Sequence, residues 1–344
     1  MYKKAVVWVL VFFCSVLFSG VGAEAFAAPA VSVTAPSVVL YDLNSDRIVY
    51  SKDPYRVRAP ASTTKVMTAI VVLEHLNMDR IVTIPQFAHT VSPSKIHLRA
   101  GERYRVRDLV RAALISSAND ATEVLGYVAG GGSLSQFSKM MNAKARAIGC
   151  KKSNFVRPSG LPDSNHYSTA YDMALIMKYA ERNYPFIVQT LKEKSRTIRS
   201  LGGRKITLRN HNKMLWRESR EVVGKTGWTR AARHCFLGHF GVNSRKVLIS
   251  ILGSQSLWKD LRKLLDFQFG SSYSKVRTNQ RLWARHEVKK IQTALRRAGF
   301  SPGPVDGQFG PATLKAVEGF QKAKGLSADG IVGPKTWDRL RRYL

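Results

Sequence analysis

The sequence is poor in acidic residues, with 23 Asp and Glu against 55 Lys and Arg, so that its formal net charge is +32. A basic surface of this kind attracts polyanions, and nucleic acid is the first candidate to consider. The basic residues are spread along the chain rather than gathered in one tail, and no nucleic-acid-binding motif accompanies them. Anionic polymers and acidic lipid surfaces therefore remain as alternative partners.

Cysteine is also scarce, with three residues in the chain. Cys14 lies in an apolar run without the small-residue context of a lipid-modified cysteine, so we expect no lipoprotein. We expect Cys150 and Cys235 to be buried single thiols, although an oxidising compartment would also permit a bridge between them. Neither the cysteines nor the eight histidines have a metal-ligand spacing, so we predict no metal or other cofactor and interpret His166 as a hydrogen-bonding loop residue.

Long hydrophobic runs are limited to one, over residues 5–21. Two lysines precede it and small residues follow, which is the layout of a secretory signal peptide over residues 1–27, cleaved after Ala25 or Ala27. An uncleaved anchor is the alternative, because the run is nearly long enough to span a bilayer. We therefore expect export to the periplasm or cell wall, with a membrane tether if the segment is retained. Export argues against nucleic acid as a partner.

The order of the predicted elements indicates the fold class. Strand patterns come first, helices follow, and strands return before a final helix, which predicts an α+β domain over residues 35–270 with helices packed on an antiparallel sheet. The strand patterns cover residues 38–41, 48–50, 205–208, 222–229, 235–240 and 247–252. The helical patterns begin at Ser62 and recur at 106–115, 121–128, 134–148, 169–181 and 258–267.

The C-terminal part contains an internal repeat. Residues 271–285 are polar and basic and are predicted to form a linker. Beyond them, Asp306–Thr313 (DGQFGPAT) is echoed by Asp329–Thr336 (DGIVGPKT). Each copy has a turn-forming Asp-Gly and a proline where a helix can begin. We expect residues 286–344 to form a small all-α bundle.

The first motif with chemical potential is Ser62–Lys65, at the start of a helix that is apolar nearly all round. Residues three apart share a helix face, so the Lys65 amine can reach the Ser62 hydroxyl. Ser62 could instead simply cap the helix. However, burial and the helix dipole both favour a neutral Lys65, as a general base requires at neutral pH. A serine beside such a base becomes a nucleophile.

The second motif, Ser117-Ala118-Asn119, lies between two helical segments. Together with Asp120, these residues can be interpreted as loop and N-cap residues of the next helix. Alternatively, a hydroxyl and an amide that project from a loop could relay a proton and hold a substrate amide. The motif alone does not decide between these interpretations.

The third motif, Lys225-Thr226-Gly227, lies on a predicted strand. A glycine there permits close approach of another backbone, so an extended peptide could bind along the strand edge. Lys225 and Thr226 would then offer a cation and a hydroxyl to a carboxylate. The alternative is a glycine at a bulge beside a solvated lysine.

The three motifs together, in this order and spacing, are similar to those of the penicillin-recognising serine enzymes. The resemblance is closest to the low-molecular-mass penicillin-binding proteins that are serine-type D-Ala-D-Ala carboxypeptidases, and it covers roughly residues 35–270. It implies a β-lactamase/transpeptidase-like fold. The segments that carry it are residues 60–68, 116–121, 158–162, 166–172 and 224–229.

The resemblance implies a function in cell-wall maturation. Ser62 would be acylated by the penultimate D-alanine of a peptidoglycan stem peptide, releasing the terminal D-alanine, and water would hydrolyse the acyl-enzyme. Lys65 would be the acylation base and Ser117 would help to transfer protons. Penicillins would acylate Ser62 and remain bound.

The resemblance also implies the substrate-binding residues, with Trp228 and Ser62 contributing oxyanion-hole N–H groups. Many relatives carry an arginine shortly after the last strand, but Leu257–Lys259 occupies that stretch here. The implied substrate-binding residues are Asn119, Lys225, Thr226, Gly227 and Trp228.

Residues 286–344 resemble the three-helix peptidoglycan-binding module of wall hydrolases, which implies binding of glycan or stem peptide. We interpret Phe309, Phe320 and Trp337 as core residues of this module rather than as a ligand platform. Some of the basic surface would meet anionic wall polymers.

Three rival functions remain. A D,D-endopeptidase that cleaves cross-links would use the same machinery. A class A β-lactamase would need a deacylating glutamate after the second motif, and residues 157–172 contain none. A non-catalytic wall-binding protein would not need the three motifs intact.

Overall fold

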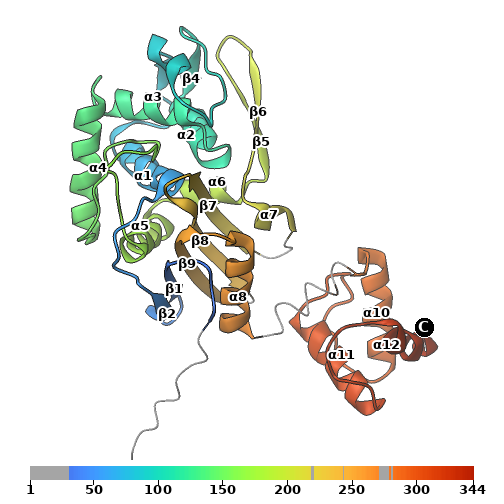
Figure 1. The fold of residues 1–344 in the computed structure, drawn as a ribbon. Helices are drawn as coiled ribbons and strands as arrows, with labels where there is room; N and C mark the ends of the chain where they lie inside the picture. Colours follow the sequence, from blue (N-terminus) through green and yellow to red (C-terminus); the bar gives the residue numbers. More distant parts are fainter. Residues whose placement is uncertain (1–30, 218–220, 243, 271–278, 280–281) are drawn as a thin grey trace, which may run out of the picture. The chain divides into compact units, whose positions relative to one another are not determined.

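The structure is a computed structural model that describes residues 31–217, 221–242, 244–270, 279 and 282–344. The predicted signal peptide (1–27) and most of the predicted linker (271–285) lie outside these described residues. Residues 32–270 and the C-terminal helices are described separately below (Figure 1). Among the described residues, no helix combines the length and the apolar composition needed to cross a membrane.

A five-stranded antiparallel sheet, of order β2-β1-β9-β8-β7, organises residues 32–270. The N-terminal hairpin of β1 (Ser37–Asp42) and β2 (Arg47–Lys52) pairs with the last strand, β9 (Arg245–Ser254). The strands β7 (Glu221–Thr229) and β8 (Arg233–Val242) complete the sheet. The first two strands of the domain therefore lie beside its last strand in one sheet.

Helices cover both faces of this sheet, and most residues of its central strands are buried. Val39, Leu237 and Leu248 belong to the large core that includes α1–α6. Successive side chains on a strand face opposite sides, so the equally buried Leu40 and Phe236 face the other side, where α8 contacts β8. The helices are α1 (Lys65–His75), α2 (Val106–Ile115), α3 (Asn119–Ala129), α4 (Leu134–Ile148), α5 (Ala170–Asn183), α6 (Pro185–Lys192), α7 (Lys213–Arg217) and α8 (Leu257–Phe269).

The α+β prediction with an antiparallel sheet is confirmed, and the predicted helices at 106–115 and 134–148 coincide with α2 and α4. The main local correction concerns the start of the central helix. Ser62 lies in a 3-10 turn, η1 (Ala61–Thr64), and α1 begins at Lys65. The predicted strand at 205–208 corresponds to β6 (Lys205–Arg209), but its partner β5 (Ser195–Arg199) was not predicted. The predicted patterns also missed α6, α7, the 3-10 turn η2 (Gln86–Thr90) and the small hairpin of β3 (Ile81–Thr83) with β4 (Arg103–Arg105).

Two predictions about single residues agree with the structure. Cys150 and Cys235 are both buried and free, as expected. His166 is buried, its Nε2 lies 2.9 Å from Thr64 Oγ1, and its Nδ1 accepts hydrogen bonds from the backbone N–H groups of Val156 and Arg157. It therefore joins the loop before α5 to the start of α1.

The C-terminal module consists of α10 (Arg285–Arg297), α11 (Pro311–Ala323) and α12 (Pro334–Leu340), followed by the 3-10 turn η3 (Arg341–Tyr343). The predicted helical bundle is confirmed. Pro311 and Pro334 stand at the first turns of their helices, as the repeat indicated.

The repeat in this module has a structural purpose. The amide of Gln292 donates to Asp306 and Thr313 and accepts from the Gly307 N–H. Gln321 makes the same contacts in the second copy, with Asp329, Gly330 and Thr336. Each Asp-Gly turn is thus fastened to the helix before it by one buried glutamine. Of the predicted core aromatics, Phe309 and Phe320 are fully buried, whereas Trp337 is half-buried beside Trp283.

Asp260 ties the start of the domain to its end. This buried carboxylate accepts hydrogen bonds from the N–H and hydroxyl of Thr34, the N–H of Ala35 and the hydroxyl of Ser254. Asp260→Ala should lower the free energy of unfolding by about 3 kcal/mol, because several donors lose a charged acceptor.

Urea denaturation measures this effect. Asp79→Ala is the matched control, because Asp79 is exposed and makes surface ion pairs with Arg105 and Arg107. It should leave the denaturation midpoint nearly unchanged. Equal losses in the two variants would contradict the role of Asp260.

Candidate active site

Ser62 lies in the 3-10 turn before the central helix, where two other segments press on the backbone. A Cβ on Gly227 of β7 would lie 2.9 Å from the Ser62 nitrogen, and a Cβ on Gly160 would lie 2.0 Å from the Ala61 carbonyl oxygen. Ala61 itself has a positive φ of 48°. The turn η1, which contains Ser62, therefore packs between β7 and the loop after α4. The Ser62 hydroxyl caps neither η1 nor α1.

Lys65 is fully buried at the first position of α1. Its Nζ lies 2.9 Å from Ser62 Oγ, 2.7 Å from Asn119 Oδ1 and 2.6 Å from the carbonyl oxygen of Ser159. Desolvation, followed by the charge of Lys225, holds the pKa of Lys65 well below its usual value.

The three contacts define what a neutral Lys65 can do. A neutral amine has two N–H donors and one lone pair. Asn119 Oδ1 and the Ser159 carbonyl can only accept, so they take both donors. The lone pair then faces the Ser62 hydroxyl, which donates to it. This geometry suits removal of a proton from Ser62.

The second motif connects α2 to α3. Ser117 has a positive φ of 56°, an unusual conformation for a residue with a side chain. Asn119 opens α3, but its side chain does not cap the helix, because its oxygen faces Lys65 and its nitrogen donates to the Ser92 carbonyl. Asp120 accepts from the N–H groups of Ile96 and Leu98 and so anchors the preceding loop. The simple capping interpretation of this motif is therefore wrong.

The third motif lies on β7, and its lysine is buried rather than solvated. Lys225 Nζ donates to Ser117 Oγ at 3.0 Å and to the Thr226 carbonyl at 2.8 Å. Burial lowers the pKa of Lys225 to about 7. Gly227 does permit close approach of another backbone, but that backbone is the Ser62 turn. Trp228 follows and is 59% exposed.

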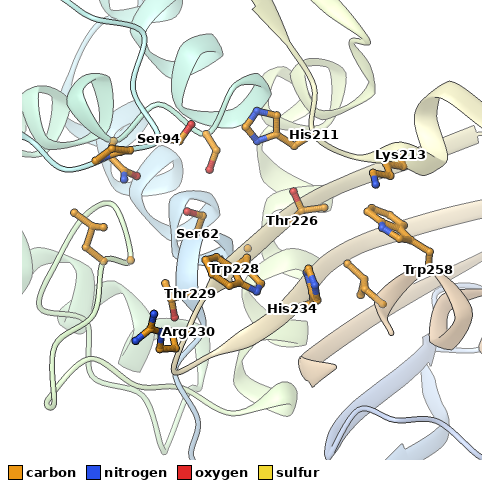
Figure 2. A pocket seen from close by; sticks show the side chains of 17 residues that line it. Ser62, Ser94, His211, Lys213, Thr226, Trp228, Thr229, Arg230, His234 and Trp258 are labelled. Atoms are coloured by element: carbon orange, nitrogen blue, oxygen red, sulfur yellow. The ribbon is translucent and has the colours of Figure 1, made fainter. Parts of the chain in front are cut away.

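A cleft of about 650 Å³ opens over these residues (Figure 2). The cleft is lined by all the predicted site residues except the two lysines: Ser62, Ser117, Asn119, Thr226, Gly227 and Trp228. The buried amine of Lys65 contacts Ser62, and that of Lys225 contacts Ser117. Trp258 lines the cleft where relatives were expected to carry an arginine, and Lys213 and Arg230 are the cations at its wall. The cleft residues that sequence reasoning missed include Ser94, His211, Lys213, Arg230 and His234.

The site has the composition of an acyl-transfer centre: a serine, a buried lysine beside it, and a second hydroxyl–lysine pair at the same cleft. Within the described residues, no group of three or more His, Cys, Asp or Glu side chains gathers as a metal site would require. Fold and site together define a serine acyl-transferase of the penicillin-recognising class.

Comparison with known families agrees with this class. Residues 23–256 match the D-alanyl-D-alanine carboxypeptidase family, and residues 285–340 match the putative peptidoglycan binding domain. The D-alanyl-D-alanine carboxypeptidase DacF of Bacillus subtilis is 29% identical over 74% of this chain and 68% of its own length. The D-alanyl-D-alanine endopeptidase of Escherichia coli is 32% identical over 67% of this chain and 74% of its own length.

Solved structures show the same relationship. The crystal structure of a D-alanyl-D-alanine carboxypeptidase from Mycobacterium tuberculosis superposes with a TM-score of 0.66 and 29% sequence identity, covering 71% of this chain and 94% of the other. The chain therefore belongs to the D-alanyl-D-alanine carboxypeptidase family of serine peptidases and carries a C-terminal peptidoglycan-binding domain.

The contact between Gly227 and the Ser62 turn can be tested directly. Gly227→Ala should slow covalent labelling by a fluorescent penicillin by about 100-fold, because the added methyl displaces the turn that holds the nucleophile. The labelling rate is read from gels at timed intervals.

Gly202→Ala is the control, because its added methyl would meet only Ser200 Oγ, at 3.8 Å. This variant should label at the wild-type rate. Wild-type labelling of Gly227→Ala would show that the close approach does not position Ser62.

Proposed function

We propose that the protein is a D-Ala-D-Ala carboxypeptidase that removes the terminal D-alanine of peptidoglycan stem peptides through an acyl-enzyme at Ser62. The observation that carries the proposal is the contact of Lys65 Nζ with Ser62 Oγ at 2.9 Å, with both amine donors directed to other oxygens. It supplies a nucleophile and its base at the wall of a cleft.

Acylation begins when Lys65 takes the Ser62 proton and Oγ attacks the penultimate D-alanine carbonyl. The backbone N–H groups of Ser62 and Trp228 are proposed to hold the oxyanion. The tetrahedral intermediate then expels the amine of the terminal D-alanine, which receives a proton through the Ser117 hydroxyl. Lys225 donates to that hydroxyl and can replace its proton.

The terminal carboxylate is proposed to bind at the Thr226 side of the cleft. Lys213 lies nearby at this wall (Figure 2) and supplies a positive charge in the absence of the expected arginine. Water then attacks the acyl-enzyme and supplies the hydroxyl of the released carboxyl group. The proton that water loses restores Lys225 through Ser117, and Lys65 returns its proton to Ser62 Oγ as the shortened peptide leaves. A penicillin presents a similar carbonyl and carboxylate, so it acylates Ser62 by the same route.

The rival functions differ in how well the site supports them. Cross-link cleavage uses the same chemistry, and a relative named as an endopeptidase supports it as the second candidate. A β-lactamase lacks support, because the nearby buried acid, Glu123, is engaged by the Ser159 hydroxyl rather than directed into the cleft. A purely wall-binding role would not require the buried amines.

Export and wall binding complete the proposal. The predicted signal peptide would deliver the enzyme to the periplasm or cell wall, where its substrate lies. The C-terminal module would then hold it on peptidoglycan. The net charge of +32 would add attraction to anionic wall polymers that depends on ionic strength.

Substitution of the nucleophile tests the catalytic proposal. Wild-type protein should release free D-alanine from a soluble pentapeptide and bind fluorescent penicillin covalently, whereas Ser62→Ala should do neither, because no oxygen nucleophile remains at position 62. Ser94→Ala, which changes another serine of the cleft, is the control and should remain labelled.

Mass spectrometry of digested sacculi then separates the two candidate activities. Loss of one D-alanine per stem indicates a carboxypeptidase, and conversion of dimers to monomers indicates an endopeptidase. A wild-type protein that neither labels nor hydrolyses would refute both.

Deletion of residues 286–344 tests the role of the module. The shortened protein should sediment less with purified sacculi at 0.15 M salt, a concentration at which long-range surface attraction is largely screened, but should hydrolyse soluble peptide at the wild-type rate. Repeating the assay with sacculi stripped of anionic polymers separates binding by the module from attraction by charge. Unchanged sedimentation would remove the binding assignment.

A further inference from the structure

Glu123 is a buried acid beside the active site that the proposed mechanism does not use. It lies on α3, just over one turn after Asn119, and is 4% exposed. Its Oε1 accepts a hydrogen bond from the hydroxyl of Ser159, which is itself fully buried. The carbonyl of Ser159 in turn accepts from Lys65 Nζ. A continuous chain of contacts therefore runs from Glu123 through Ser159 and Lys65 to Ser62.

We propose that Glu123 is a positioning residue for the acylation of Ser62: it fixes the Ser159 carbonyl that, together with Asn119, orients the Lys65 lone pair, and it places a negative charge close to that amine. This inference rests on the function proposed above. It assigns a role to a residue that does not touch the substrate.

The surroundings of Ser159 show that Glu123 is not needed merely to hold the loop. The hydroxyl of Thr68 on α1 already donates to the Pro158 carbonyl at 2.6 Å. On the other side, Gly160 packs directly against the Ala61 carbonyl. Burying a carboxylate is costly unless it is paired, so a residue that only filled space here would be expected to be apolar. An apolar residue at position 123 could not supply this negative charge.

The charge of Glu123 acts on Lys65 against two larger effects. Desolvation and the charge of Lys225 on β7 lower the pKa of Lys65, whereas Glu123 and Asp120 on α3 raise it. The carboxylate of Asp120 is occupied by the backbone N–H groups of the loop before it. The other titratable groups near Lys65 are the imidazoles of His166, in the loop before α5, and His211, just before α7.

The sign of the expected pH effect follows from these charges. Acylation requires neutral Lys65, so its rate falls as pH drops through the pKa of the free enzyme. Glu123→Gln keeps an acceptor for Ser159 but removes the negative charge, which favours neutral Lys65. The acid limb of the rate profile should therefore move to lower pH, by about one unit, while the plateau stays near the wild-type rate.

Ser159→Ala separates the positioning effect from the charge effect. It cuts the link between Glu123 and the Ser159 backbone but leaves the carboxylate in place. The plateau rate should fall about tenfold, because the lone pair of Lys65 is less well oriented, and the acid limb should stay near its wild-type pH. A merely structural role of Glu123 would produce neither this separation nor a shifted limb.

The experiment is the second-order rate of acylation of the full chain by a penicillin, measured from about pH 4 to 9, a range that brackets the acid limb of a base with a lowered pKa. Glu74→Gln is the matched control: Glu74 is on α1, where it contacts Lys144 and Tyr184, and its profile should match the wild type. Thermal unfolding followed by circular dichroism checks that each variant folds.

The outcomes are separable. If the acid limb of Glu123→Gln coincides with that of the wild type or moves to higher pH, the role of Glu123 is overturned while the proposed function stands. If Glu123→Gln does not fold, the role of Glu123 is overturned when the plateau acylation rate of Ser159→Ala equals that of the wild type. If wild-type protein is not acylated at any pH, the proposed function itself fails, and this inference fails with it.

Discussion

The burial of Lys65 is the constraint on which the rest of the site depends. An amine at this depth is stable as a base only if its environment disfavours the proton, and desolvation is the largest contribution to that effect. Within the described residues, no carboxylate forms an ion pair with Lys65 or with the buried Lys225. A carboxylate paired directly with Lys65 would hold that amine protonated and leave no lone pair for Ser62. The hydrogen bonds of the two amines go instead to neutral oxygens, and Glu123 is connected to Lys65 through Ser159.

The architecture provides this burial by placing the site where sheet and helices meet. Lys65 is the first residue of α1, the helix at the centre of the main core, and Lys225 lies on the edge strand β7, so the two amines come from different layers. Close backbone contacts at Gly160 and Gly227 hold the Ser62 turn between these layers. The positive φ values of Ala61 and Ser117 show that the chain accepts unfavourable backbone conformations at these two points. Packing of the surrounding layers must compensate for that strain.

The sequence was informative where a pattern is tied to a physical requirement. Strongly amphipathic helices such as α2 and α4 were predictable to the residue, and the three motifs identified side chains that the structure brings together around Lys65. The hairpin of β5 and β6 was only half predicted, because β5 is exposed at almost every position and has no apolar alternation. Glu123 was not predictable either, since a glutamate in a helix is usually solvated. Lys213 and Arg230 could not be distinguished among 55 basic residues.

The chain thus uses lysine in two physically different ways. At the surface, Lys and Arg side chains retain their charge, and their long-range attraction to anionic polymers is screened within about 10 Å at ordinary salt. In the core, burial is the largest influence on the protonation of Lys65 and Lys225, and for Lys65 a few nearby charges add to or oppose it. The basic surface can therefore vary widely without altering the chemistry at Ser62. A single buried charge such as that of Glu123 has greater influence on Lys65 than many exposed ones.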